Sequence, residues 1–150
     1  MSPYLNVYSV TIANVSRNSI SVLINIGLNK QTVETLLDCG AGGMFIDQNF
    51  AKNYQIEKLD EPVKAFNVDG TENKKGTIKS YVDLQFQLGD KTFKEQFYVT
   101  GLGKQKIILG FPWLHKHNPI IDWKKGEITW KPPKIDWKKL LKKEQKNKQN

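Results

Sequence analysis

Apolar residues recur at every second position in several stretches of the chain, which is the period of a β-strand with one buried face. In residues 20–28 the alternating side chains are Ile20, Val22, Ile24, Ile26 and Leu28. The same alternation, or a short apolar run between turn residues, predicts further strands at residues 31–37, 63–68, 78–88, 93–99, 107–109, 120–123 and 127–130. The pattern therefore predicts a mainly β protein with many short strands.

Helical spacing occurs in only two short stretches before the C-terminal region. Asp47 is a suitable N-cap, because Phe50, Ala51 and Tyr54 follow on one helical face. A second short helix is predicted from Pro112, since proline is tolerated in the first turn, and Asn118-Pro119 ends it. Beyond residue 133 the chain becomes polar and lysine-rich, which indicates a solvated or weakly helical tail.

The chain has 150 residues, of which 39% are apolar, enough for one domain with a modest core and too few for a two-lobed enzyme. It carries 23 basic and 15 acidic residues, a net charge of +8. Residues 131–150 hold eight lysines and two acidic residues, a net charge of +6, which leaves +2 for residues 1–130. The excess positive charge therefore belongs mainly to the tail.

Several classes of protein are disfavoured by what the sequence lacks. It has no run of 18 apolar residues, and residues 1–15 do not resemble a secretory signal. The single cysteine, Cys39, cannot form an internal disulfide. His115 and His117 point to different faces of a helix, so no shared metal is expected. We expect an intracellular, cytoplasmic protein without a cofactor, a metal or a membrane partner.

One segment combines a carboxylate with unusual backbone. Leu36-Leu37-Asp38 ends a predicted apolar strand, and three glycines occur in the next five residues, Cys39-Gly40-Ala41-Gly42-Gly43. Glycines in such a loop allow close backbone approach, and a carboxylate held there is oriented by backbone N–H groups and partly desolvated. Taken alone, an Asp-x-Gly sequence is also typical of an ordinary surface turn.

Two further segments change the interpretation of Asp38. A glycine-bounded hairpin is predicted around residues 67–76, and the apolar run Ile107-Ile108-Leu109 ends at Gly110, before the helix at Pro112. With these three segments, the sequence resembles the retropepsin-like aspartic proteases over roughly residues 18–130. Within that family, residues 117–119 and 121–126 resemble the protease domain of Ty3/gypsy-type retrotransposon polyproteins.

The resemblance implies a fold, a domain organisation and an activity. The implied fold is mainly β: a retropepsin-like, closed, barrel-like acid protease fold with a flap hairpin, short helices and one lobe per chain. Residues 1–17 would be an N-terminal strand or extension, 18–130 the protease domain and 131–150 a basic, lysine-rich tail. Aspartic proteolysis needs two carboxylates that share a proton, and the chain has one Asp in the matching position. The implied protein is therefore a homodimeric aspartic endopeptidase that pairs two copies of Asp38 and processes a retroelement polyprotein.

The resemblance also implies roles for the residues around Asp38. The catalytic loop and substrate-binding backbone would comprise Cys39, Gly40, Ala41, Gly42 and Gly43. The flap would include Val68, Asp69, Gly70, Thr71 and Gly76, and would close over a peptide bound as an added strand. Ile108, Leu109 and Gly110 would support the catalytic loop from beneath.

Cys39 departs from the family pattern, which has Ser or Thr at this position. A thiol is a weak hydrogen-bond donor, so a hydroxyl-mediated brace between two catalytic loops would be weaker. One alternative is therefore a catalytically weakened dimerisation or binding module. A second alternative, Cys39 as a nucleophile, requires His115 or His117 as a nearby base and is disfavoured.

The tail leaves further alternatives open. Trp137, Leu140 and Leu141 are interleaved with lysines at spacings of three and four, which suits RNA, an anionic surface or a protein partner. A weak nucleic-acid contact through residues 131–150 is one of these alternatives. The tryptophans at 113, 123 and 130 are interpreted as core or edge cover rather than as stacking platforms for nucleic acid.

Overall fold

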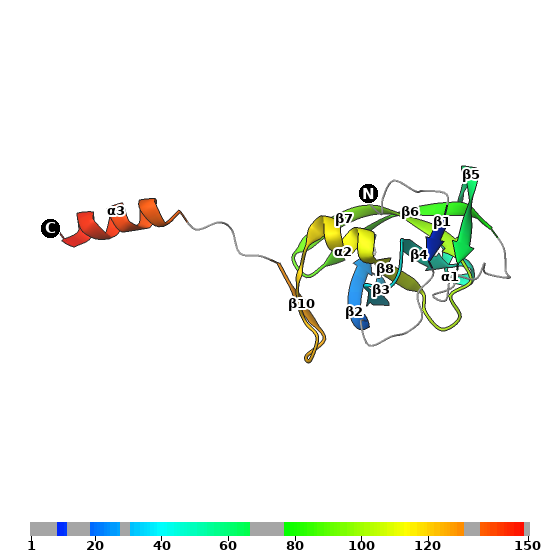
Figure 1. The fold of residues 1–150 in the computed structure, drawn as a ribbon, viewed down its shortest axis with the longest axis horizontal. Helices are drawn as coiled ribbons and strands as arrows, with labels where there is room; N and C mark the ends of the chain where they lie inside the picture. The colour runs from blue at the N-terminus through cyan, green and yellow to red at the C-terminus, as the bar shows by residue number, and fades with distance from the viewer. Residues whose placement is uncertain (1–8, 12–18, 28–30, 67–76, 131–135, 149–150) are drawn as a thin grey trace.

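The computed structural model describes residues 9–11, 19–27, 31–66, 77–130 and 136–148. Its body is a strongly curved β-sheet, and a separate helix follows near the C-terminus (Figure 1). Among these residues, no helix is long and apolar enough to cross a bilayer.

Six strands form a closed ring. They are β2 (Ser19–Ile26), β3 (Gln31–Asp38), β4 (Met44–Asp47), β6 (Ile78–Leu88), β7 (Lys91–Thr100) and β8 (Ile107–Gly110). Around the ring the order is β6-β2-β3-β8-β4-β7, and the pairing of β6 with β7 closes it. Most neighbours are antiparallel, but β3 with β8 and β4 with β7 are parallel. Closure leaves the ring without a free edge.

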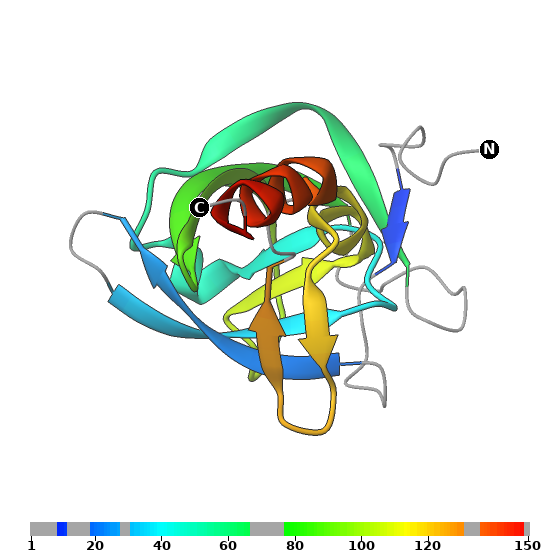
Figure 2. The same ribbon diagram turned by 90° about the vertical axis from the view of Figure 1, so that its left-hand side faces the viewer.

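Smaller elements extend this ring. Strand β5 (Glu57–Phe66) pairs with β6, and β1 (Ser9–Thr11) pairs in parallel with β5. Helix α1 (Gln48–Ala51) follows β4, and helix α2 (Phe111–His117) follows β8. Strands β9 (Ile120–Asp122) and β10 (Glu127–Thr129) form a hairpin that lies beside β2 in Figure 2. Helix α3 (Trp137–Lys148) completes the described chain.

The core consists of two clusters of buried apolar side chains with β8 between them. Ile107 and Leu109 belong to the larger cluster, whereas Ile108 belongs to the smaller one. Because both faces of β8 are covered, all four of its residues are buried. A strand that is buried on both faces has a continuous run of apolar residues instead of alternating apolar and polar residues.

An aromatic group fixes α2 against the β6–β7 hairpin. The indole of Trp113 is 1% exposed and packs edge-on against Phe93, with ring centroids 5.2 Å apart. Trp130 approaches both of these rings and lies beneath the ammonium of Lys91. Trp113 and Trp130 are thus part of the body's packing, as expected, whereas Trp123 lies in the β9–β10 turn and is exposed.

Most predicted elements are present, with informative differences at the ends. The strand predicted at residues 63–68 begins earlier in the structure, at Glu57. The sequence pattern missed its first half because those residues are mostly polar and do not alternate. Its register against β6 shifts between Lys58 and Val63, and Pro62, which has no N–H, lies in that interval. The cap at Asp47 is confirmed, since its carboxylate accepts from the N–H groups of Asn49 and Phe50.

Strand β4 was not predicted, whereas the three residues of β1 lie within residues 1–17, which were interpreted as an N-terminal strand or extension. The short apolar run Met44-Phe45-Ile46 was the available signal for β4. The predicted weakly helical tail is helical from Trp137 to Lys148.

Candidate active site

The predicted catalytic loop is built by three strands of the ring. Strand β3 ends at Asp38, the loop follows, and β4 begins at Met44. Strand β8 lies between them: it pairs in parallel with β3, placing Gly110 opposite Asp38, and antiparallel with β4, placing Leu109 opposite Met44. The loop therefore passes over the end of β8, so residues about 70 positions apart in the sequence meet here.

Gly110 provides the space for this crossing. A β-carbon at residue 110 would collide with the carbonyl oxygens of Gly43 and Ala41. The Phe111 N–H also donates to the carbonyl of Ala41 over 2.8 Å, which ties the start of α2 to the loop. Gly110 thus lies against the backbone of the loop, and only glycine fits there without moving backbone.

Asp38 is enclosed at this crossing, with a side chain 0% exposed. Its Oδ1 accepts a hydrogen bond from the Gly40 N–H over 2.7 Å. Its Oδ2 is also buried, and no group of the described chain hydrogen-bonds to it. Burial raises the pKa of Asp38 above its ordinary value, and the Gly40 N–H opposes this in part. The carboxyl group is therefore biased towards its protonated form, with one oxygen unsatisfied.

The rest of the loop alternates between exposed and buried positions. Cys39, Gly40 and Gly42 are exposed, whereas Ala41 and Gly43 are buried. Ala41 packs in the smaller core cluster, and its N–H donates to the Asp38 carbonyl over 3.2 Å. The exposed positions leave backbone accessible beside the buried carboxylate, as a site for an extended peptide requires.

Cys39 is exposed, but its environment does not activate it. Partial burial raises the pKa of its thiol, and the neighbouring Asp38 charge raises it further. The thiolate, which is the nucleophilic form, is therefore disfavoured. Of the two candidate bases, His117 is engaged elsewhere, because its Nε2 lies 3.0 Å from the Glu95 Oε1. These observations weigh against cysteine catalysis.

The smaller cluster connects the predicted catalytic loop to strands β5 and β6, the arms of the predicted flap. Its buried members are Leu36, Ala41, Phe45, Val63, Ala65, Ile78 and Ile108. Val63 of β5 lies opposite Ile78 of β6, so the two flap arms are paired at this point. The flap residues Val68, Asp69, Gly70, Thr71 and Gly76 lie outside the described residues.

Asp47 has a positioning role that the sequence only half indicated. Besides capping α1, its Oδ1 accepts from the Leu102 N–H over 2.9 Å, and its own N–H donates to the Lys106 carbonyl. These hydrogen bonds fix the β7–β8 connection and so help to position β8 beneath the loop that follows Asp38. The capping signal was local, whereas the contact with Leu102, 55 residues away, had no sequence signature.

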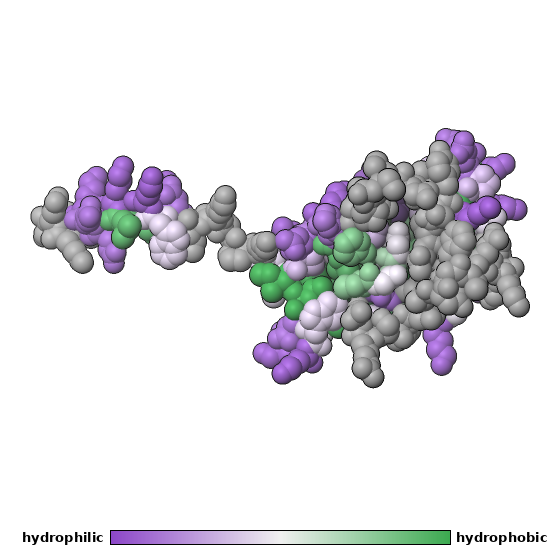
Figure 3. Space-filling model, viewed as in Figure 1, coloured by the Kyte–Doolittle hydropathy of each residue, from purple (hydrophilic) through white to green (hydrophobic). Residues whose placement is uncertain are grey.

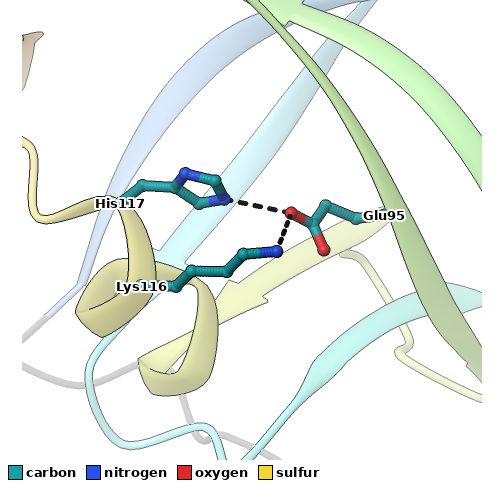
Figure 4. Close-up of polar contacts among 3 residues, drawn as sticks. All are labelled: Glu95, Lys116 and His117. Atoms are coloured by element: carbon teal, nitrogen blue, oxygen red, sulfur yellow. Dashed lines mark hydrogen bonds and ion pairs between the residues drawn. The ribbon is translucent and has the colours of Figure 1, made fainter.

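His117, Lys116 and Glu95 form a separate cluster on α2 and β7 (Figure 4). The Glu95 Oε1 accepts from His117 and also lies 3.6 Å from the Lys116 Nζ. The His117 ring packs on Phe93, with centroids 4.7 Å apart. Within the described ranges, no three His, Cys, Asp or Glu side chains are grouped so that they could hold a metal ion.

The closed six-stranded ring, with a buried aspartate where one strand passes into a glycine loop over a second strand, has the retropepsin-like protease fold. A family model for the PEG10/RTL1 protease domain matches residues 34–138, which include Asp38, the loop after it, strands β5 and β6, and Gly110. The chain belongs to this family. The predicted boundaries at residues 17 and 130 stay predictions.

Solved structures with similar folds include three proteins of low sequence identity. The retroviral protease-like domain of Ddi1 from Leishmania major has 17% identity and a TM-score of 0.49, with 81% of this chain and 96% of that chain covered. An inhibitor complex of EIAV protease has 13% identity and a TM-score of 0.49, covering 70% and 93%. A retropepsin-like aspartic protease from Rickettsia conorii has 18% identity and a TM-score of 0.45, covering 74% and 82%.

Proposed function

We propose that this protein is an aspartic endopeptidase that acts as a homodimer, with Asp38 from each copy forming the catalytic pair. The observation that carries the proposal is the Asp38 carboxyl group, which is fully buried, held at Oδ1 by Gly40 and unsatisfied at Oδ2. Burying a polar atom without a hydrogen-bond partner costs free energy of folding. Because this chain belongs to a family of protease domains, the unpaired Oδ2 of Asp38 favours a partner supplied from outside this chain.

The chemistry of the proposed pair follows from two carboxyl groups that share one proton. Like charges in contact cannot both be ionised, so one group stays protonated while the other acts as a base. The ionised group takes a proton from a water molecule, whose oxygen adds to the scissile carbonyl carbon. The protonated group gives its proton to the carbonyl oxygen. The newly protonated carboxyl group then gives its proton to the amine nitrogen as the C–N bond breaks. The other carboxylate takes a proton from a hydroxyl group of the tetrahedral intermediate, which becomes the product acid, so the pair again holds one shared proton.

A twofold axis beside the loop would supply the second carboxyl group. In a C2 dimer the same surface meets itself, so Asp38 near the axis would meet its own copy. The raised pKa of Asp38 in the single chain favours the singly protonated state of such a pair at mildly acidic pH. We expect cleavage to be fastest under mildly acidic conditions and to fall as both carboxyl groups become ionised.

The substrate side of the proposal rests on the exposed loop backbone and the paired flap arms. A peptide in extended form would lie along residues 39–43 as an added strand, with the flap segment closing over it. In line with the sequence resemblance, we propose a retroelement polyprotein of the Ty3/gypsy type as the natural substrate. Cleavage of a peptide library by the full chain, blocked by a statine-type inhibitor, is the direct test.

The decisive variant is Asp38→Asn, which keeps the shape of the side chain but cannot hold the shared proton. We expect loss of cleavage with the fold retained. Asp83→Asn is the matched control, because Asp83 lies exposed on β6. Retained cleavage in Asp38→Asn, or a chain that sediments as a strict monomer while it cleaves, would contradict the two-aspartate site.

The second candidate function is a retropepsin-like dimerisation or binding module with little catalysis. Cys39 is the observation that favours it, because an exposed thiol beside Asp38 offers a weaker donor than a hydroxyl for bracing two loops. Replacing Cys39 with Ser or Thr distinguishes the two functions. A weakened protease would dimerise more tightly and cleave faster, whereas a module without catalysis would show no cleavage with either residue.

A further inference from the structure

Helix α3 has two chemically different faces, and both are open to solvent. Trp137, Leu140 and Leu141 lie within about one turn on one side, since residues three and four apart share a helix face. Their exposed fractions are 67%, 49% and 56%. Figure 3 shows a small hydrophobic area on α3 with hydrophilic side chains around it.

The opposite side of α3 is basic. Its lysines with described side chains are Lys138, Lys139, Lys142, Lys143 and Lys146. The helix starts at its own cap, because the Asp136 carboxylate accepts from the Lys139 N–H over 3.2 Å. Every side chain from residue 136 to residue 146 is exposed, so the packing of the barrel does not account for the apolar face.

We propose that α3 binds the surface of a lipid bilayer that carries anionic headgroups. In this arrangement the helix lies in the plane of the interface, with Trp137, Leu140 and Leu141 entering the boundary between headgroups and acyl chains. The lysines stay in the headgroup layer and are attracted by its negative charge. An indole has an apolar ring and one polar N–H, and it suits this depth better than either water or hydrocarbon.

The spacing of the apolar side chains favours a bilayer over a protein groove. A helix that docks in a groove presents anchors over at least two turns, at spacings such as i, i+3, i+4 and i+7. In α3 the position seven residues after Trp137 is Glu144, so the apolar face ends after Leu141. A bilayer surface accepts a short apolar face at one end of a basic helix, because it has no fixed shape to fill.

The same side chains favour a bilayer over nucleic acid. RNA binding uses positive charge and aromatic stacking, so lysines and Trp137 would serve it. Leu140 and Leu141 have no role in such contacts and would stay in water. A bilayer accounts for all three apolar side chains and for the lysines together.

The experiment uses the full chain with vesicles of phosphatidylcholine, either pure or with roughly a third phosphatidylserine. We expect co-sedimentation with the anionic vesicles only, a blue shift of tryptophan emission and weakening by salt. Trp137→Ala should weaken binding roughly tenfold. Trp123→Ala is the matched control, since Trp123 is also exposed, at 45%, but lies in the β9–β10 turn, and it should bind like the original.

Two further variants separate charge from apolar contact. Lys142→Gln with Lys143→Gln should weaken binding by roughly tenfold or more, whereas Lys124→Gln with Lys125→Gln, an exposed pair on the body, should change it little. Glu144→Leu extends the apolar face and should tighten vesicle binding more than Glu144→Gln, which only removes the charge.

The proposal is overturned if anionic vesicles do not bind the chain, or if Trp123→Ala weakens binding as much as Trp137→Ala. It is also overturned if polyuridylic acid binds as tightly as the vesicles do and binding to both depends on the lysines alone. That result would assign α3 to nucleic acid. The proposed two-aspartate site contains no residue of α3, so failure here leaves the proposed protease function standing.

Discussion

The barrel and α3 contain the same types of apolar residue in opposite environments. Leu109 in β8 is 0% exposed and Trp113 in α2 is 1% exposed, whereas Leu140 and Trp137 in α3 are about half and two-thirds exposed. The barrel buries its apolar residues because six strands close on one another, while α3 has no second layer to cover its face. Residue type therefore specifies what can be buried, and the surrounding elements decide what is buried.

The largest contrast is expected at two glycines. Gly110→Ala places a methyl group against the carbonyl oxygens of Gly43 and Ala41, so we expect a loss of about 4 kcal/mol in the free energy of unfolding. Gly126→Ala meets no atom within 4 Å, and its cost is only the strain of a positive φ, about 1 kcal/mol. Urea denaturation of both variants checks this. Equal losses would mean that the loop does not depend on the space at Gly110.

The next contrast compares leucines in the two regions. Leu109→Ala leaves a cavity in the core beneath the loop that follows Asp38 and should cost about 3 kcal/mol of unfolding free energy. Leu140→Ala removes an exposed side chain and should change the free energy of unfolding of the barrel by less than about 0.5 kcal/mol. Thermal unfolding without lipid is the measurement. A large effect of Leu140→Ala would show that α3 packs on the body in solution.

A third prediction concerns pH and the buried carboxyl group. The pKa of Asp38 is raised in the folded chain, so folded protein binds more protons than unfolded chain at pH values between the ordinary and the raised pKa. The contribution of Asp38 to stability is therefore full at low pH and is lost as pH rises through this interval, with a slope of at most about 1.4 kcal/mol per pH unit.

Asp38→Asn should abolish that part of the pH dependence, and Asp83→Asn should leave it intact. Chemical denaturation at a series of pH values, on samples shown to be monomeric by sedimentation, measures the difference in slope. Identical slopes for the original and Asp38→Asn would mean that the carboxyl group has an ordinary pKa in the single chain.

The smallest expected effects are in the cluster shown in Figure 4. The Glu95 side chain is 10% exposed and contacts His117, so Glu95→Gln should cost about 1 kcal/mol of unfolding free energy. Lys116 is 67% exposed, and Lys116→Gln should cost no more than about 0.3 kcal/mol despite its contact with the same carboxylate. The ratio of the two losses, measured by urea denaturation, tests whether burial controls the strength of these contacts.

The strands of the barrel were largely predictable because alternation reports one buried and one solvated face. Strand β2 is the clearest case, since Val22, Ile24 and Ile26 are buried as their spacing indicates. Strand β8 was recognised as a short apolar run, and the two core clusters explain why it does not alternate. The polar first half of β5 and the short β4 carried little periodic signal, so their pairings came only from the structure.

For the candidate site, the sequence singled out Asp38, the glycines that follow it and Gly110. It did so through local chemistry and the resemblance to retropepsin-like proteases. The collision that a β-carbon at Gly110 would cause, the unsatisfied Oδ2 of Asp38 and the reach of Asp47 to Leu102 depend on positions far apart in the chain. Local patterns do not record such distances.

By itself, the sequence determined the β-rich character, the position of the glycine loop that follows Asp38 and the separation of a nearly neutral body from a basic tail. These features depend on side-chain chemistry and short-range spacing, which are written in the order of residues. Only the tertiary structure decided that β8 passes between β3 and β4, that Asp38 is fully enclosed and that the apolar face of α3 stays exposed. Burial and close contact depend on which distant segments meet, because the free energy of packing belongs to pairs of surfaces and not to single segments.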